Sequence, residues 1–255
     1  MFLNELVCPK IGLYGNYNFF KQMGVFLKHK FNSFSTQIIM QNKDQQNQGK
    51  LPLSFYTRSN VLLIAKELLG KLLVTHINHV LTAARIVETE AYNGIIDQAS
   101  HAFGGRKTNR TQVMYANGGT AYVYLCYGMH HLFNVVTNEE GIPHAILIRA
   151  AEPVKGVEEM LLRTGKTKLD FTLTKGPGNV SKALGITTQL TGFNLLEDTI
   201  SIVNDGYVLK EDAIICTPRI GVDYAGEDAV LPYRFIVNNN PYVSGKKNKI
   251  LGIRK

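Results

Sequence analysis

Two glutamates stand two residues apart in an otherwise apolar run, Glu88 and Glu90 in ARIVETEAY. In an extended strand, residues i and i+2 point to the same face, so the two carboxylates are expected to be neighbours. Like charge and burial would raise the pKa of one of them, which suits a carboxylate that takes a proton from water. Glu90 is the better candidate, because it lies near the strand end beside Tyr92 and a loop. An edge strand whose carboxylates are solvated or paired with Arg or Lys is the alternative, and spacing alone leaves it open.

A tyrosine-rich segment follows, in which 120–125 and 131–136 are predicted strands of a hairpin. Tyr122 and Tyr124 alternate on one strand face and could stack on an extruded base. Tyr127 would occupy the turn, where a ring has little to bury against, and such a ring can wedge between stacked bases. The alternative, that the rings belong to the core, fits Tyr122 and Tyr124 better than Tyr127.

Basic residues could approach phosphates from two loops, namely Arg106, Lys107 and Arg110 beside two glycines, and Lys175 before a Gly-Pro-Gly turn. That turn opens a helix, whose first N–H groups can bind an anion, although such a turn is often only a turn. Asn134, on the return strand of the hairpin, could donate to a base edge or serve only the structure.

Histidines give no metal signature. His101 lies in the basic loop, and His130 and His131 are adjacent, so in a strand they point to opposite faces. No ligand triad with His144 or Cys126 has the usual spacing, and we expect neither a metal nor a cofactor. The sequence also lacks a P-loop, a GxGxxG after a strand and a GxSxG elbow.

The composition bounds the class of protein. The chain has 255 residues, 45% of them hydrophobic and 19% charged, as in an ordinary folded protein. The net charge of +8 favours a polyanionic partner, nucleic acid or an acidic membrane surface, although basic proteins without such a partner exist. The three cysteines are widely spaced and form no CxxC pair, which argues against a disulfide framework and favours a reducing, intracellular compartment.

The N-terminal segment differs from the rest. Residues 1–50 have aromatic side chains without a period and end in QNKDQQNQGK, so we interpret them as a poorly ordered extension outside the core. No secretory signal is recognised, and no apolar run approaches the roughly 18 residues of a membrane-spanning helix. We expect a protein that is not secreted, in the cytoplasm or nucleoid of a bacterium or the nucleus of a eukaryote.

The elements that position the candidate residues begin near Leu51. A helix is predicted over 61–69, capped by Thr57 or Ser59 and ended by Gly70. A long polar loop, 93–111, is expected to hold a short helical turn over 97–101. Further predicted strands are 71–77, 80–92, 145–150, 200–203, 213–218 and 233–237, and further helices are 157–163 and one within 174–185. The prediction is a single α+β domain over 51–255, a mainly antiparallel curved sheet with flanking short helices and a protruding β-hairpin.

Several of these segments together resemble the alkyladenine (3-methyladenine) DNA glycosylase family. The resemblance is carried by RIVETEAY, SHAFGGRKTNR, TAYVYLCYGMHHLFNVV, ILIRAAEP, KGPGNVSKALGI and RIGVDYAGEDAVLPYRF, which occur in the family's order between about Leu51 and Ser244. It implies a monofunctional enzyme that flips alkylated or deaminated purines out of double-stranded DNA and hydrolyses the N-glycosidic bond. It further implies a monomer that starts base excision repair and has no membrane partner.

The resemblance also implies a role for individual residues. Glu90 matches the general base, Arg149 an arginine that helps to hold the attacking water, and Ile220 a residue whose carbonyl does likewise. Tyr127 matches the tyrosine that fills the gap left by the flipped nucleotide. The remaining matches are to the base pocket: Tyr92, His101 and Tyr124 enclose the base, and Asn134 discriminates against the amino group of guanine.

Two departures from the family pattern stand at His130 and His131, where relatives often have bulkier aromatic residues. The return strand of the hairpin is therefore expected to contact DNA differently, and the range of lesions stays open. Two other function classes also stay open. One is a non-catalytic nucleic-acid-binding module that uses the same basic surface, and the other is a metal-dependent hydrolase that uses the histidines.

Overall fold

The computed structural model describes residues 49–245, and the predicted extension over 1–50 lies almost entirely outside them. The twelve helices and strands of the described chain are α2 Leu53–Tyr56, α3 Val61–Glu67, β1 Leu72–Ile77, β2 Val80–Tyr92, β3 Ala121–Cys126, β4 His130–Thr137, β5 His144–Lys155, α4 Val157–Thr164, α5 Pro177–Leu184, β6 Ile200–Val203, β7 Ile214–Thr217 and β8 Arg234–Val237. Short 3-10 segments join them: η1 Gly94–Ile96, η2 Phe103–Gly105, η3 Gln112–Tyr115, η4 Phe171–Leu173, η5 Thr188–Leu190, η6 Glu211–Ala213 and η7 Asp223–Val230.

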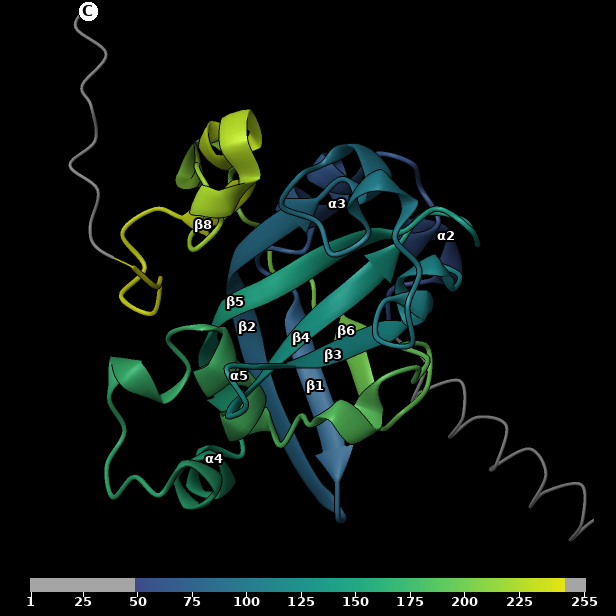
Figure 1. The fold of residues 1–255 in the computed structure, drawn as a ribbon. Helices are drawn as coiled ribbons and strands as arrows, with labels where there is room; N and C mark the ends of the chain where they lie inside the picture. Colours follow the sequence, from purple (N-terminus) through teal and green to yellow (C-terminus); the bar gives the residue numbers. More distant parts are fainter. Residues whose placement is uncertain (1–48, 246–255) are drawn as a thin grey trace, which may run out of the picture. The chain divides into compact units, whose positions relative to one another are not determined.

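All strands of the described chain belong to one antiparallel sheet with the order β3-β4-β5-β2-β1-β6, and β8 pairs with β2 and β7. The sheet curves, and short helices lie around it (Figure 1). The predicted α+β class, with a curved antiparallel sheet in one domain, is confirmed for this part of the chain.

β2 is the central strand of the sheet, because it pairs with three others, β1, β5 and β8. One edge pairs with β1 over Val80–Arg85 and then with β8 over Glu88–Glu90, and the other edge pairs with β5. The second half of β2 is therefore enclosed by strands on both sides. Its carboxylates lie between β5 and β8, elements that come from distant parts of the sequence.

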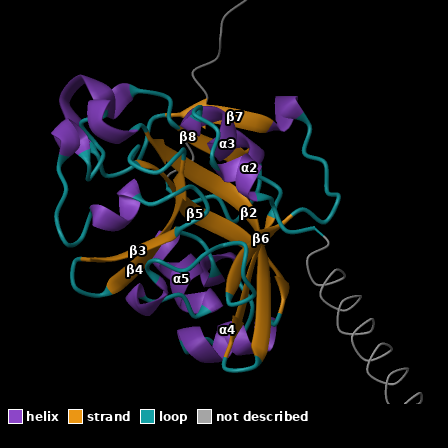
Figure 2. Cartoon of the chain, turned by 90° about the vertical axis from the view of Figure 1, so that its right-hand side faces the viewer, coloured by secondary structure: helices purple, strands orange, loops and turns teal. Residues whose placement is uncertain are grey.

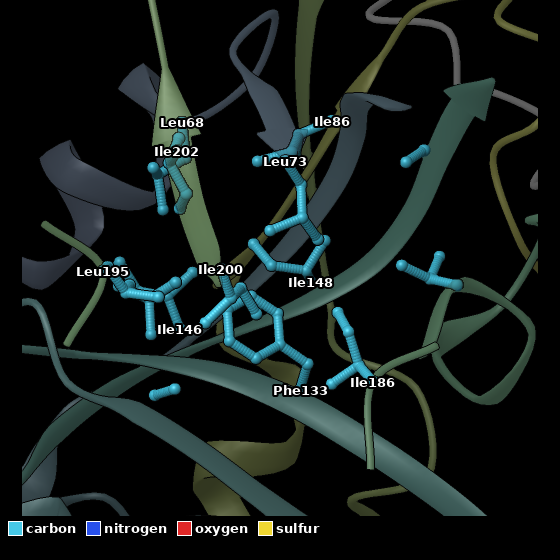
Figure 3. Packing of buried hydrophobic residues seen from close by; sticks show 14 of the residues in the cluster. Leu68, Leu73, Ile86, Phe133, Ile146, Ile148, Ile186, Leu195, Ile200 and Ile202 are labelled. Carbon is cyan, nitrogen blue, oxygen red and sulfur yellow. The ribbon is translucent and has the colours of Figure 1, made fainter. Parts of the chain in front are cut away.

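The core fills one face of this sheet. Large apolar side chains from the strands pack together and against the helices, among them Leu73, Ile86, Phe133, Ile146, Ile148 and Ile202, all fully buried (Figure 3). Alternate residues of β2 and β5 supply this face, as period-2 strands require. The opposite face of the same strands carries polar and apolar side chains together, with Glu90 directly across from Leu147.

Local chemistry explains most element bounds. Asn78 and His79 both adopt positive φ and join β1 to β2 in the predicted two-residue turn. The predicted helix cap is wrong: Asn60 caps α3, because its side chain accepts from the N–H of Leu63. Gly70 does adopt the left-handed conformation expected after the helix.

Two further predictions need correction. The predicted helical turn over 97–101 is a series of hydrogen-bonded turns between η1 and η2, not a helix of its own. β5 continues past Ala150 to Lys155 and includes Pro153. The proline is tolerated because β4 pairs only with the first part of β5, so its missing N–H interrupts no ladder on that edge.

Candidate active site

Two bulges set the carboxylates against an arginine. Ile86 pairs with Ala151 and Glu88 with Ala150, so Val87 is an extra residue in β2. Thr89 then pairs with Ile148, so Arg149 is an extra residue in β5. A bulge redirects side chains and is frequent beside active sites. Here it brings the Arg149 guanidinium between the two glutamates.

Glu88 is a fully satisfied structural anion. Its side chain is fully buried and accepts from Arg149 Nε at 2.9 Å and Arg234 Nε at 2.7 Å. The backbone N–H of Ser244 donates to it at 2.6 Å and the Ser244 hydroxyl at 2.9 Å. Burial acts to raise the pKa of Glu88, but the two arginines and the Ser244 N–H outweigh it, and the pKa falls below its ordinary value. Glu88 is therefore held ionised.

Glu90 is also fully buried, with fewer charges around it. Arg149 Nη1 lies 3.3 Å from its Oε2, the Tyr92 hydroxyl donates to Oε2 at 3.0 Å, and the Ile220 N–H donates to Oε1 at 2.8 Å. Burial raises the pKa of Glu90 and wins over these three partners, with the charge of Glu88 adding to the rise. Two adjacent carboxylates whose pKa values are pushed apart are the usual sign of divided structural and acid–base roles.

The three partners of Glu90 open onto one cavity of about 380 Å³. Its wall is mostly aromatic and apolar, and it is lined by Tyr92, His101, Met114, Tyr122, Tyr124, Leu132, Ala145, Leu147, Arg149, Ile220 and Tyr224, among others. The volume suits a bound small molecule or one base. Glu90 lies behind the wall formed by Tyr92, Arg149 and Ile220.

His101 and the tyrosines make the aromatic part of the wall. The rings of His101 and Tyr124 are 4.7 Å apart and nearly perpendicular, and those of Tyr122 and Tyr124 are 5.5 Å apart. Burial, with the nearby charges of Arg110 and Arg106, lowers the pKa of His101 to about 4. The imidazole is therefore neutral at pH 7 and adds no positive charge to the cavity.

Asn134 lines the cavity from β4, but not in the orientation predicted for a donor. Its Nδ2 donates to the carbonyls of Tyr122 and Leu132, each at 3.2 Å. A carbonyl can only accept, so these contacts fix the amide orientation and use both N–H groups. These contacts fit the structural alternative and leave the amide oxygen to accept, and donation to a base edge stays a prediction.

Figure 2 shows the hairpin that β3 and β4 form at one side of the described chain. Tyr127 lies in its turn, as predicted, and is 90% exposed. Its φ of 50° lies in the left-handed region, which is unfavourable for a bulky residue and uncommon outside Gly, Asn and Asp. The turn therefore holds an aromatic ring in solvent at a conformational cost. Tyr122 is instead buried, as the core alternative allows, although its hydroxyl contacts His101 at 2.9 Å.

The predicted basic residues fall into two groups. Arg106, Lys107 and Arg110 are exposed on the loop beside the cavity, where Arg110 lies 4.8 Å from the Tyr124 ring. Lys175 precedes α5, and its Nζ donates to the carbonyl of Pro241 at 3.2 Å. The start of α5 lines the cavity and lies beside the hairpin, where a Cβ on Gly178 would meet His130 at 3.0 Å.

Ile220 contacts Glu90 through a different atom from the one expected. The resemblance implies a role for its carbonyl, whereas the contact in this structure is made by its N–H. The half-exposed side chain lines the cavity. Both backbone groups of one residue can serve such a site, since the N–H can orient the carboxylate while the carbonyl accepts from another partner.

The two unusual histidines have separate surroundings. His130 is exposed and lines the cavity, and His131 Nδ1 accepts from the N–H of Thr188 at 3.2 Å. Within residues 49–245 no three His, Cys, Asp or Glu side chains are grouped so that they could hold a metal ion. In the same part of the chain no helix has the length and apolar character required to cross a membrane.

Sequence patterns missed several residues of the site. Arg234 and Ser244 bind Glu88 from positions 146 and 156 residues away along the chain. Tyr224 lines the cavity, and its hydroxyl donates to the carbonyl of Ala99 at 3.2 Å. The one available signal was the aromatic and basic content of RIGVDYAGEDAVLPYRF, because no local pattern specifies contacts over this separation.

Comparison with known proteins identifies the family to which this chain belongs. A model of the methylpurine-DNA glycosylase family matches residues 54–241. A protein of Bacillus cereus (strain AH820), provisionally named 3-methyladenine DNA glycosylase, is 45% identical over 203 residues, which cover 76% of this chain and 98% of that protein. A protein of Chlamydia abortus (strain DSM 27085 / S26/3) with the same name is 47% identical over 189 residues, covering 74% of this chain and 98% of its own length. The chain therefore belongs to the methylpurine-DNA glycosylase family and is a DNA glycosylase, a hydrolase of N-glycosyl bonds.

Proposed function

We propose that this protein flips an alkylated or deaminated purine nucleotide out of duplex DNA and hydrolyses its N-glycosidic bond with a water activated by Glu90, which starts base excision repair. One observation carries the assignment of the base. Glu90 is a fully buried carboxylate of raised pKa, and its three partners, Arg149, Tyr92 and Ile220, all line the cavity.

The chemical step transfers one proton and breaks one bond. The water oxygen attacks the anomeric carbon of the sugar, and the bonding electron pair of the C–N bond leaves with the purine. The proton of the water passes to Glu90, whose raised pKa makes it a stronger base than a solvated glutamate. Arg149 and the Ile220 carbonyl are the proposed partners of that water, and Arg149 also stays paired to Glu88 at 2.9 Å.

The cavity wall suits the leaving group. An N-alkylated purine is cationic before the bond breaks, and aromatic faces attract a cation. Tyr92 and Tyr124 supply such faces, and the neutral His101 between them and the basic loop does not repel the charge. Asn134 offers only its oxygen, which could accept from the amino group of guanine, so the proposed discrimination against guanine arises from shape, through the space available for that amino group.

Extrusion of the nucleotide has a cost of a few kcal/mol for unstacking and unpairing. Tyr127 is proposed to offset it, because its exposed ring at the hairpin tip can fill the gap left in the stack. The backbone is proposed to be held by Arg106, Lys107, Arg110 and Lys175, which flank the cavity from two sides. The functional unit is proposed to be a monomer on double-stranded DNA.

A base-release assay tests this proposal. Duplexes that carry one hypoxanthine, ethenoadenine or 7-methylguanine, and methylated DNA that contains 3-methyladenine, are incubated with the enzyme and compared with undamaged duplex. We expect release of at least one damaged base and strand breakage only after alkali, since a monofunctional enzyme leaves an intact abasic site. No release from any of these DNAs, or breakage without alkali, would contradict the proposal.

A further inference from the structure

We propose that Arg219 and Asp97 form a buried positioning pair that holds two of the three hydrogen-bond donors of Glu90, the Tyr92 hydroxyl and the Ile220 N–H, in place and thereby sets the rate and the pH dependence of base release. Neither residue is part of the cavity wall. The inference rests on the proposed function, with Glu90 as the general base. It concerns residues that act on the reaction only through others.

The pair is a bidentate ion pair closed off from solvent. Arg219 Nη1 and Nη2 donate to the two carboxylate oxygens of Asp97 at 2.5 and 2.9 Å. The side chains are 0% and 1% exposed. A planar guanidinium held at two points against a carboxylate has one orientation, which makes it a rigid support for its neighbours.

Arg219 is linked to both of these donors, the Tyr92 hydroxyl and the Ile220 N–H. Its Nη1 also donates to the carbonyl of Ala91, the residue between Glu90 and Tyr92, at 2.9 Å. Its guanidinium carbon lies 4.9 Å from the centre of the Tyr92 ring, whose hydroxyl donates to Glu90. The next residue is Ile220, whose N–H donates to Glu90. One guanidinium therefore fixes the end of β2, the ring of Tyr92 and the peptide of Ile220.

Asp97 ties this support to the loop after β2. Its carboxylate accepts from the N–H groups of Asn93 and Ala99, each at 3.0 Å. On the far side, Arg219 Nη2 donates to the carbonyl of Asp228 in η7 at 3.2 Å. The pair thus joins the strand that carries Glu90 to the segment that carries Ile220.

Stability alone is a weak reason for such a pair. A buried ion pair contributes little compared with apolar side chains of the same volume. Arg219 Nε is buried and has no hydrogen-bond partner among residues 49–245, which is itself unfavourable. What the pair supplies, and apolar side chains would not, is a fixed orientation for the groups around Glu90.

A positioning role and a simple charge effect predict opposite changes in the pKa of Glu90 for Asp97→Asn. If only charge mattered, removal of the Asp97 charge would leave Arg219 less neutralised and would lower the pKa of Glu90. If the pair positions the donors, its loosening withdraws the Ile220 N–H and the Tyr92 hydroxyl from Glu90, and the pKa of Glu90 rises. The ionised carboxylate is the active form. A higher pKa of Glu90 therefore moves the low-pH limit of activity to higher pH, and a lower pKa moves it to lower pH.

The experiment measures single-turnover release of 3-methyladenine from methylated duplex DNA between pH 4.5 and 9. This lesion is already cationic in DNA and leaves as a neutral base without being protonated, so the low-pH limit reports the general base. For Asp97→Asn we expect that limit to move to higher pH and the plateau rate to fall about ten- to hundredfold, the typical cost of a slightly misplaced catalytic group. Affinity for undamaged duplex should stay at the wild-type value.

The chain offers a matched control in Arg85 and Asp205. Arg85 binds both oxygens of Asp205 at 3.1 and 2.8 Å, donates to a backbone carbonyl and lies 4.2 Å from the Tyr207 ring. It has the same chemistry without a link to Glu90. Asp205→Asn should leave both the limit and the plateau rate unchanged.

A second variant covers the case in which Asp97→Asn does not fold. Arg219→Lys keeps the charge and cannot make the bidentate contact. A charge effect therefore predicts that the low-pH limit of activity stays in place, and a positioning role predicts that it moves to higher pH as in Asp97→Asn. A limit that moves down in Asp97→Asn, or stays in place in Arg219→Lys, overturns the inference. If Glu90→Gln keeps wild-type activity, the proposed function fails instead, so the two failures are distinguishable.

Discussion

Arg149 joins the two buried carboxylates of β2: its Nε donates to Glu88 at 2.9 Å and its Nη1 to Glu90 at 3.3 Å. The two carboxylates share this cation but not their other surroundings. Glu88 also has Arg234 and Ser244, and its pKa is lowered, whereas burial dominates at Glu90 and its pKa is raised. One strand therefore carries an ion-paired carboxylate of lowered pKa and a carboxylate of raised pKa two residues apart.

Substitution of the two glutamates should affect stability very differently. Glu88→Gln leaves Arg149 and Arg234 buried without their shared anion, and we expect a loss of about 3–5 kcal/mol in the free energy of unfolding. Glu90→Gln removes a charge that burial disfavours and should change stability by about 1 kcal/mol or less. Urea denaturation measures both values. Equal losses in the two variants would show that Glu90 is as structural as Glu88.

Activity should fall at low pH as Glu90 takes up a proton. Because burial raises the pKa of Glu90 above that of a solvated glutamate, the loss should begin at a higher pH than an unperturbed carboxylate would give. Protonation of Glu90 has the opposite effect on the stability of the fold from its effect on activity. A raised pKa in the folded state means that protonation of Glu90 favours folding, and that its contribution is lost as the pH rises through the folded pKa.

The pH dependence is measured as the single-turnover rate on methylated DNA, with the fold followed by circular dichroism over the same range. The pKa of Glu88 is lowered and that of Glu90 is raised, so Glu90 is the carboxylate of the two that we expect to set the limit. Loss of activity that tracks unfolding would remove the assignment to Glu90. A profile without any low-pH limit would do the same.

The proposed role of Tyr127 in DNA binding should be separable from the stability of the hairpin. Asn tolerates the left-handed backbone that Tyr127 adopts, so Tyr127→Asn should leave the free energy of unfolding unchanged or raise it by up to about 1 kcal/mol. The same change should weaken binding to lesion-containing duplex more than binding to undamaged duplex, since only the first requires the wedge. Fluorescence anisotropy on both duplexes gives the ratio, and equal losses would exclude the wedge.

The salt dependence of DNA binding tests the basic loop. Replacement of Arg106 or Lys107 by Ala should flatten the plot of log affinity against log salt by about 0.9 per lost phosphate contact. Lys210 is a suitable control, because it is exposed on a segment whose Tyr207 packs on Arg85, away from the cavity. A slope that changes equally for Lys210→Ala would mean that overall charge, and not this loop, is measured.

Much of the fold could be predicted from local patterns. The strand over 80–92 has the predicted bounds, since its alternation and the flanking turn are encoded in neighbouring residues. The predicted cap of α3 was wrong, because three residues before the helix can cap it, Thr57, Ser59 and Asn60, and backbone geometry chooses between them. The role of Arg149 as an extra residue in β5 could not be predicted from pattern, since a bulge is a property of two strands that are paired across the chain.

The site was predictable in part. Tyr92, His101 and Tyr124 lie together on the cavity wall, and it was the family resemblance, not their spacing, that grouped them in advance. Arg234 and Ser244 were missed because their partner, Glu88, is far away in sequence. Asn134 could be predicted as a pocket residue but the orientation of its amide could not, since the two carbonyls that orient it are backbone atoms that no side-chain pattern reveals.

The central claim is that Glu90 activates the water, and single-turnover base release by Glu90→Gln tests it most directly. The measurement uses methylated duplex DNA with enzyme in excess, and binding to the same DNA is measured in parallel. Loss of release by at least about a hundredfold, the scale of a general-base contribution, with binding close to wild type, is the predicted result. Release at the wild-type rate by a folded Glu90→Gln variant would contradict the account.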